Sequence, residues 1–199
     1  MNIDYNLAMQ SFFSLGIEND FSFYSQSKQV SLFDELEKGA ITPDEFHHRI
    51  KKLSVKNLTD EQIDSAWNSM ILELPPERII LLEKANKNYR TFMLSNSNSI
   101  HYDVYIRNLN EKYGYKNFSG LLEKVYFSHQ VKMKKPDREI FELLINENKL
   151  NPKETLFIDD TVQHIEAAKQ VGLRTHYLTN RETITDLFDD EGRLKRMYQ

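Results

Sequence analysis

The chain has 199 residues, no cysteine, and a formal net charge of −4 from 26 basic and 30 acidic side chains. This length allows one large domain or a core domain with a smaller companion. The lack of cysteine excludes disulfides, thiolate metal sites and cysteine nucleophiles, and the mildly acidic balance argues against nucleic acid as a partner. The sequence contains no apolar stretch of membrane-spanning length and its start lacks a signal-peptide pattern, so we expect a cytoplasmic protein with no membrane partner.

Residues 5 to 74 are predicted to form consecutive helices. Apolar residues recur at helical spacing from Tyr5 onward, and glycines follow the first two expected helices. Thr42 with Glu45, and Thr59 with Gln62, have the spacing of capping boxes at the starts of two further helices. Together these segments indicate a small all-helical domain over residues 1–74.

From residue 75 the pattern changes to short apolar strands that alternate with helices. Helices are expected from Pro76 to about residue 87 and in the segments SIHYDVYIRNLN, PDREIFELLINENK and TVQHIEAAKQV. Strands are expected at YRTFMLS, VYF, TLFI and RTHYLT. Such alternation predicts an α/β fold over residues 75–199, with a Rossmann-like parallel sheet flanked by helices.

Polar clusters follow several of these predicted strands or lie in the next loop. They are Ser95 with Asn96, then Lys135, then the adjacent pair Asp159 and Asp160. Ligands of open parallel sheets bind at the carboxyl ends of the strands, and two adjacent carboxylates there repel each other unless a cation compensates them. Each cluster alone also has a plainer interpretation, namely a turn, a solvated lysine and a helix N-cap.

The order and spacing of the clusters are more specific than any one of them. The segments FMLSNSN, MKKPDREIF and FIDDTVQHIEAAKQVG resemble motifs II, III and IV of the haloacid dehalogenase-like superfamily, and the helical segment before them is similar to that family's helical cap. Within the superfamily the chain looks most like bacterial sugar-phosphate phosphatases, which are related to the phosphatase domain of soluble epoxide hydrolase. The resemblance implies a magnesium-dependent phosphatase that hydrolyses a small phosphorylated metabolite through an aspartyl-phosphate.

The resemblance also implies a role for each polar residue. Ser95 would hydrogen-bond the transferring phosphoryl group with help from the backbone of Asn96, and Lys135 would balance charge on the nucleophile and the phosphoryl group. Asp160 would bind Mg²⁺ directly, with Asp159 as a second or water-mediated ligand. True dehalogenases need no metal, so two acids at this motif favour a phosphatase.

One family motif has no counterpart in the chain. Motif I is a central apolar strand that ends in Asp-x-Asp and supplies the nucleophile, whereas only MNID precedes the first expected helix and Asp4 is its sole acid. We therefore interpret MNIDYN as the residues that follow motif I, and we favour a truncated enzyme over a noncatalytic binding or regulatory relative. Loss of a central strand leaves its neighbours unpaired unless they close up or recruit another strand, so strand exchange between chains is possible.

His164 is a second departure from the family pattern. The family commonly has Asp or Asn at this position, where the side chain helps to orient the loop. Histidine can replace those hydrogen bonds or add pH sensitivity, and we expect a plain substitution. A third interpretation, an unrelated doubly wound protein whose Asp pair only caps a helix, requires Ser95, Lys135 and Asp160 to lie far apart.

Overall fold

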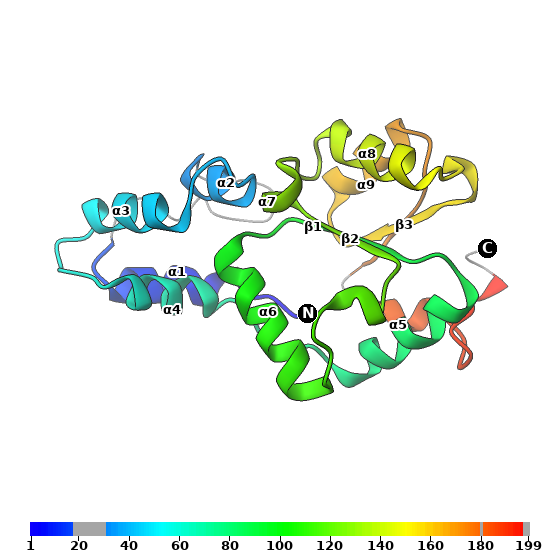
Figure 1. The fold of residues 1–199 in the computed structure, drawn as a ribbon, viewed down its shortest axis with the longest axis horizontal. Coiled ribbons are helices and arrows are strands. Elements are labelled where there is room, and N and C mark those ends of the chain that lie inside the picture. Colours follow the sequence, from blue (N-terminus) through cyan, green and yellow to red (C-terminus); the bar gives the residue numbers. More distant parts are fainter. Residues whose placement is uncertain (18–30, 180, 197–199) are drawn as a thin grey trace. The chain divides into compact units, whose positions relative to one another are not determined.

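The computed structural model describes residues 1–17, 31–179 and 181–196 (Figure 1). By compactness the chain divides into one unit of Met1–Pro75 and Ser97–Lys116 and another of Pro76–Asn96 and Asn117–Gln199. The domain division at residue 74 stays a prediction, because compactness groups residues 97–116 with the first unit. Within the described ranges, every helix is too short or too polar to cross a membrane.

The first unit is built from helices, as predicted for residues 5 to 74. Its core contains the aromatic residues Phe12, Phe33, Phe46 and Trp67, each at most 1% exposed. The ring centroids of Phe33 and Trp67 are 4.5 Å apart, so these aromatic side chains pack directly against each other in that core. The helices are α1 (Tyr5–Ser14), α2 (Ser31–Glu37), α3 (Pro43–Leu53), α4 (Asp60–Asn68) and α6 (Ser99–Tyr113).

Local capping signals account for the starts of α3 and α4. The predicted capping box of α4 is confirmed, since Thr59 Oγ1 accepts the backbone N–H of Gln62 at 3.3 Å while Gln62 Oε1 accepts that of Thr59 at 2.9 Å. At α3, Thr42 Oγ1 accepts the backbone N–H of Glu45 at 3.2 Å. The Glu45 carboxylate is 2.7 Å from Nε of Arg49 one turn further on, so the second half of the box predicted there does not form.

The first residues of the chain pair with the segment that leaves α4. Ile3 and Ile71 form an antiparallel bridge, and the backbone N–H of Asp4 donates to the carbonyl of Met70 at 2.9 Å. The Asp4 side chain accepts the backbone N–H of Asn6 at 3.0 Å and caps α1. Asp4 therefore begins a helix, as expected for residues that lead directly into the first helix.

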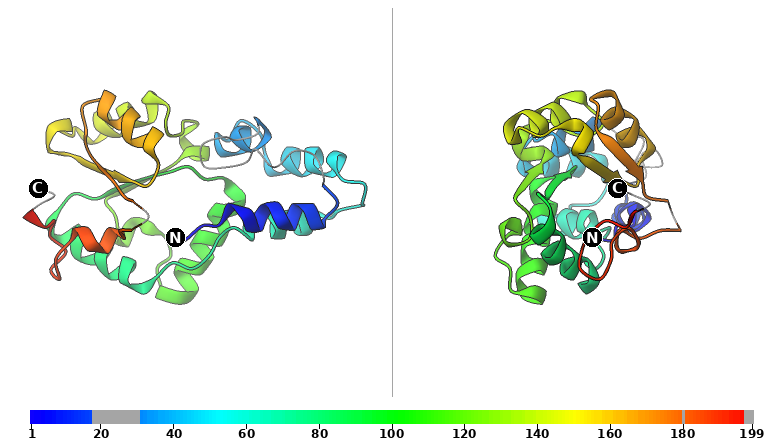
Figure 2. Two further views of the ribbon diagram at one scale, coloured as in Figure 1. Left: turned by 180° about the vertical axis from the view of Figure 1, so that it is seen from behind. Right: turned by 90° about the vertical axis from the view of Figure 1, so that its right-hand side faces the viewer.

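The second unit has the predicted alternation of strands and helices. Helices α8 and α9 lie on one side of the strands, and α5 lies with the C-terminal segment on the other (Figures 1 and 2). Apolar side chains such as Leu94, Phe141 and Ala168 fill the core below α8 and α9. The elements are α5 (Pro76–Asn88), β1 (Phe92–Ser95), η2 (Phe118–Gly120), β2 (Lys124–Phe127), α7 (Ser128–Val131), α8 (Arg138–Asn148), η3 (Pro152–Glu154), β3 (Leu156–Asp159), α9 (Val162–Gln170), β4 (Arg174–Tyr177) and η4 (Ile184–Leu187).

The strands are parallel, as predicted, and they form two pairs. β1 pairs with β2 from Phe92 opposite Lys124 onward, and β3 pairs with β4 from Leu156 opposite Arg174 onward. Over the described residues, the ladders join neither β1 nor β2 to β3 or β4, so the sheet is not continuous. Each of β1 and β3 is thus paired along one edge.

The C-terminal segment folds back against α5. Phe188 and Leu194 form an antiparallel bridge around a turn that contains Gly192, whose φ is +74°. A Cβ atom on Gly192 would lie 2.7 Å from the carbonyl carbon of Lys84 in α5. This position therefore requires glycine for both its backbone angle and its close approach to the helix.

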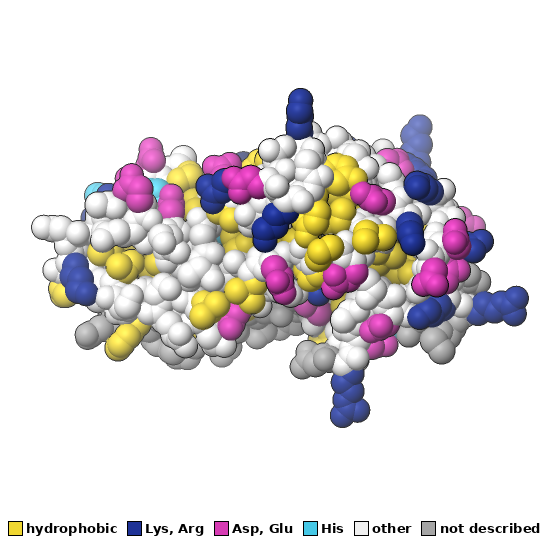
Figure 3. Space-filling model, turned by 90° about the horizontal axis from the view of Figure 1, so that it is seen from below, with side chains coloured by type: hydrophobic (Ala, Val, Ile, Leu, Met, Phe, Trp, Pro, Cys, Tyr) yellow, Lys and Arg dark blue, Asp and Glu magenta, His cyan; other side chains and the backbone are white. Residues whose placement is uncertain are grey.

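Charged side chains are mixed on the face shown in Figure 3. Basic and acidic side chains are interspersed there, and those of the described residues do not gather into one basic field. The expectation that nucleic acid is not a partner stays a prediction.

Candidate active site

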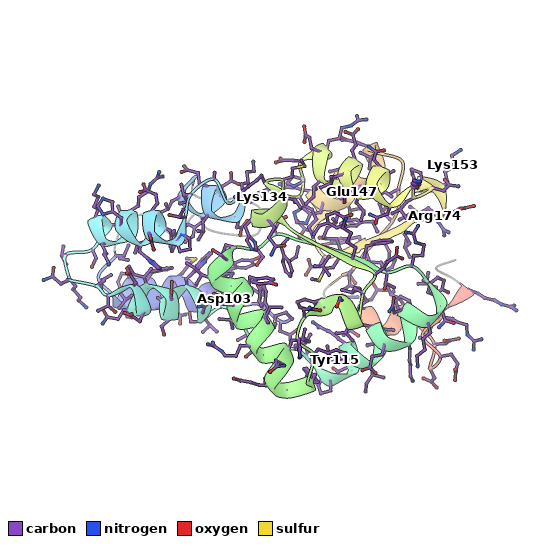
Figure 4. All side chains as sticks on the ribbon, in the orientation of Figure 1. Asp103, Tyr115, Lys134, Glu147, Lys153 and Arg174 are labelled. Carbon is purple, nitrogen blue, oxygen red and sulfur yellow. The ribbon has the colours of Figure 1, made fainter. Side chains whose placement is uncertain are left out.

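The predicted site residues of the second unit lie at strand ends or in the loop after α7. Ser95 is the last residue of β1 and Asn96 follows it, while Asp159 is the last residue of β3 and Asp160 follows it. Lys135 comes from the loop between α7 and α8; its neighbour Lys134 lies beside α7 (Figure 4). The contacts described below link the ends of the two strand pairs through this loop.

Asn96 holds the backbone of the loop that carries Lys135. Its side-chain oxygen accepts the backbone N–H of Lys135 at 2.9 Å, and its side-chain nitrogen donates to the Lys135 carbonyl at 2.8 Å. Two hydrogen bonds between one amide and one residue fix both position and orientation. The sequence predicted a backbone role for Asn96, and it did not predict this side-chain role.

Lys135 and Asp159 form a buried ion pair. Nζ of Lys135 is 2.7 Å from Oδ2 of Asp159, and the two side chains are only 10% and 7% exposed. Burying two charges costs free energy that their attraction repays only when geometry is good and further hydrogen bonds satisfy the remaining lone pairs. Asp159 has such hydrogen bonds on its other oxygen, and the Lys135 ammonium also lies 5.7 Å from the ring centroid of Phe157.

The other oxygen of Asp159 accepts two hydrogen bonds. Oδ1 lies 2.9 Å from the backbone nitrogen of Thr161 and 2.9 Å from Nδ1 of His164. Burial by itself raises the pKa of the Asp159 carboxyl, but the hydrogen bond with His164 and the positive charge of Lys135 outweigh burial and hold this pKa well below its usual range. Asp159 is therefore an ionised carboxylate at neutral pH.

Asp160 lies next to this cluster and is exposed. Its Oδ1 is 3.4 Å from the hydroxyl of Thr161, the N-cap residue of α9. Thr161 makes no side-chain cap hydrogen bond, and its own backbone N–H donates to Asp159, so the Asp pair lies directly before the N-cap position of α9. Within the described ranges, no three His, Cys, Asp or Glu side chains are grouped as a complete metal site.

Ser95 is connected to this cluster through its sequence neighbour, Asn96. It is half-buried at the end of β1, opposite Phe127 of β2, and precedes Asn96 directly. The structure thus joins Asn96, Lys135 and Asp159 by direct contacts and adds Thr161 and His164 to them. The roles assigned to Ser95, Asn96, Lys135, Asp159 and Asp160 stay predictions.

Known proteins of one family are similar to this chain in sequence and fold. A family model described as haloacid dehalogenase-like hydrolase matches residues 80–172. The D-ribitol-5-phosphate phosphatase of Bacteroides thetaiotaomicron is 30% identical over 175 residues, which cover 88% of this chain and 84% of that protein. The chain belongs to the haloacid dehalogenase-like hydrolases.

Solved structures agree with this haloacid dehalogenase-like assignment. A HAD family enzyme from Bacteroides thetaiotaomicron, an aspartate-to-alanine variant in complex with magnesium and inorganic phosphate, is 32% identical with a TM-score of 0.88, and the match covers 95% of this chain and 93% of that chain. A predicted HAD-like family hydrolase from Porphyromonas gingivalis is 25% identical with a TM-score of 0.82, covering 94% and 89%. The predicted α/β fold and family are confirmed, and the unrelated doubly wound protein is excluded.

Proposed function

We propose that this haloacid dehalogenase-like protein is a magnesium-dependent phosphatase of a small phosphorylated metabolite, once an aspartate nucleophile is supplied. The observation that carries the proposal is the buried Lys135–Asp159 ion pair, held against Asn96 and followed directly by Asp160. A lysine ammonium fixed in this way suits a dianionic phosphate. The relationship to a D-ribitol-5-phosphate phosphatase supports a phosphorylated sugar or polyol as the substrate class.

The chain's own residues would bind and orient the phosphoryl group. The hydroxyl of Ser95 and the backbone N–H of Asn96 would donate to its oxygens, and Lys135 would neutralise its charge. Phosphoryl transfer depends mainly on positioning and charge stabilisation, so donors at rigid strand ends serve this reaction well.

The carboxylates after β3 fit a magnesium ion. Mg²⁺ prefers carboxylate oxygens and retains several waters, and it is commonly held by one or two carboxylates together with substrate phosphate. Both oxygens of Asp159 already accept hydrogen bonds, whereas Asp160 is exposed. Asp160 would therefore be the direct ligand and Asp159 a water-mediated one. When bound, the ion would neutralise negative charge on the phosphate.

The nucleophile would come from an additional strand. No two aspartates in the 199-residue sequence are separated by a single residue, so an Asp-x-Asp motif is not among them. β1 and β3 carry Ser95 and Asp159 at their ends, and in the described part of the chain each pairs along one edge. A parallel apolar strand that ends in Asp-x-Asp would complete both ladders and bring an aspartate to the level of Lys135.

Phosphate release by two proteins tests this proposal. The first is the 199-residue chain, and the second carries an apolar strand ending in Asp-x-Asp fused ahead of Met1, with an Asn-x-Asn strand as matched control. We expect hydrolysis of D-ribitol 5-phosphate or a generic phosphate monoester by the Asp-x-Asp protein alone, with loss on chelation or on Asp160→Asn.

The outcomes separate the parts of the proposal. Robust hydrolysis by the 199-residue chain would refute the statement that this chain lacks its nucleophile. Full activity of the fused Asp160→Asn protein would refute the assignment of Asp160 as a metal ligand. A folded Asp-x-Asp protein that binds phosphate without hydrolysing it would support the alternative, a noncatalytic binding or regulatory protein. The DNA before the Met1 codon gives an independent test, since an in-frame apolar run ending in Asp-x-Asp favours the enzyme.

A further inference from the structure

His164 contacts the site although the proposed reaction gives it no role. It lies in the first turn of α9, is 6% exposed, and its Nδ1 is 2.9 Å from Oδ1 of Asp159. An ionised carboxylate only accepts hydrogen bonds, so Nδ1 of His164 carries the hydrogen and donates it. His164 is thus a fixed donor aimed at one particular oxygen.

The donors around Asp159 are divided between its two oxygens. Oδ1 receives His164 Nδ1 and the backbone N–H of Thr161, and Oδ2 receives Nζ of Lys135. The side-chain amide of Asn96 holds the backbone of Lys135 at the other end of this network. The position of the ammonium therefore depends on the orientation of the Asp159 carboxylate, and that orientation depends on the two donors to Oδ1.

We propose that His164 is a positioning residue that locks the Asp159 carboxylate and through it holds the Lys135 ammonium at the phosphate site. The proposal rests on the proposed phosphatase function. The Thr161 N–H fixes one bond to Oδ1, but a single bond leaves the carboxylate able to rotate about it. The donor from α9 removes this freedom, because a rotation that moves Oδ2 away from Lys135 would also break the His164 bond.

Three variants at His164 separate hydrogen bonding from packing. His164→Asn keeps a donor near the place of Nδ1, whereas His164→Leu fills similar space without one. His164→Gln keeps a polar donor but moves it one bond further from the backbone. If His164 only packs α9 against β3, His164→Leu should match the parent at least as well as His164→Asn does.

The first readout needs no enzyme activity. In the 199-residue chain labelled with ¹⁵N-lysine and ¹⁵N-histidine, we expect the His164 spectrum to show a hydrogen on Nδ1. The Lys135 ammonium resonance, assigned with Lys135→Met, should be retained in His164→Asn and shifted or broadened in His164→Leu and His164→Gln. An unchanged Lys135 resonance in both His164→Leu and His164→Gln would overturn the proposal.

The second readout uses the phosphatase with its Asp-x-Asp strand restored. Residues that orient the groups around a metal or catalytic centre typically contribute roughly 10- to 100-fold. We expect kcat/KM to fall by roughly this factor in His164→Leu and His164→Gln and to stay within about threefold of the parent in His164→Asn. Equal loss in all three variants, or loss in none, would overturn the positioning role.

The two readouts distinguish this inference from the proposed function. If the restored protein never hydrolyses phosphate, the proposed function fails, and the resonances still decide whether His164 holds Lys135. If it is active and His164→Leu matches the parent, only the positioning role fails. Circular dichroism identifies any variant that does not fold, and His164→Gln then replaces His164→Leu in the comparison.

Discussion

The buried Lys135–Asp159 pair should show strong energetic coupling. Lys135→Met leaves the Asp159 carboxylate with the His164 and Thr161 donors but without a positive partner, and Asp159→Asn leaves the ammonium buried without a counter-charge. Removing one member of a buried pair typically costs about 3–5 kcal/mol, and the remaining donors to Asp159 put the Lys135 variant near about 3 kcal/mol. The double variant buries no charge at these positions, so we expect it to lose clearly less than the sum, with a coupling energy of about 2–3 kcal/mol.

Urea unfolding followed by circular dichroism measures this cycle, with the free energy of unfolding extrapolated to water. The control is the same cycle on Glu166 and Lys169, an ion pair of similar length, 2.8 Å, whose side chains are 58% and 53% exposed. We expect a coupling energy below about 1 kcal/mol there, since exposed pairs contribute little. If the buried pair couples no more strongly than this control, our account of the Lys135 site is wrong.

Further predictions concern pH, the Lys135 loop and a turn. Folding lowers the pKa of Asp159, so the contribution of this carboxylate to stability should be complete above the unfolded carboxyl pKa of about 4 and lost as pH falls through the folded value. Urea unfolding at pH 7, 4 and 3 should therefore show a flatter decline of stability for Asp159→Asn than for the parent. Parallel curves for the two proteins would contradict this prediction. Asn96→Ala should cost about 1–3 kcal/mol of stability, because it removes both side-chain hydrogen bonds to the Lys135 backbone. The variant should also bind inorganic phosphate more weakly, as measured by calorimetry. Unchanged phosphate affinity would count against the role of Asn96 in holding the Lys135 loop. Gly192→Ala should cost clearly more stability than Gly114→Ala, because both residues have φ +74° but only a Cβ at position 192 would clash with α5. In thermal unfolding the Gly114 variant should lose about 1 kcal/mol of stability. Equal losses in the two variants would show that the close approach to α5 is not the cause.

Elements whose signals are local were predictable from the sequence. Thr59 and Gln62 begin α4 through a reciprocal capping box, and Pro76 begins α5. These signals act over one helical turn, so they need no knowledge of the fold. Glu45 marks the limit of this reasoning, since its carboxylate had a second partner, Arg49, also one turn away.

The candidate site was predictable in part. The order of Ser95, Lys135 and Asp160 identified the family from the sequence alone, and the family is now shown by comparison. The contacts among these residues were not predictable, because Lys135 lies 39 residues from Asn96 and 24 from Asp159. Which side chain meets which across such distances depends on how the strands pair.

The sequence by itself determined the longer helices, the strands, the parallel α/β class and the family, because periodicity, capping and motif spacing are properties of neighbouring residues. Only the tertiary structure decided that the strands form two pairs and that Asp159 bonds Lys135, Thr161 and His164 together. A carboxylate selects its partners by distance and direction in space. For that reason two aspartates that look alike in the sequence differ in the structure: Asp159 is buried and paired with Lys135, whereas Asp160 beside it is exposed.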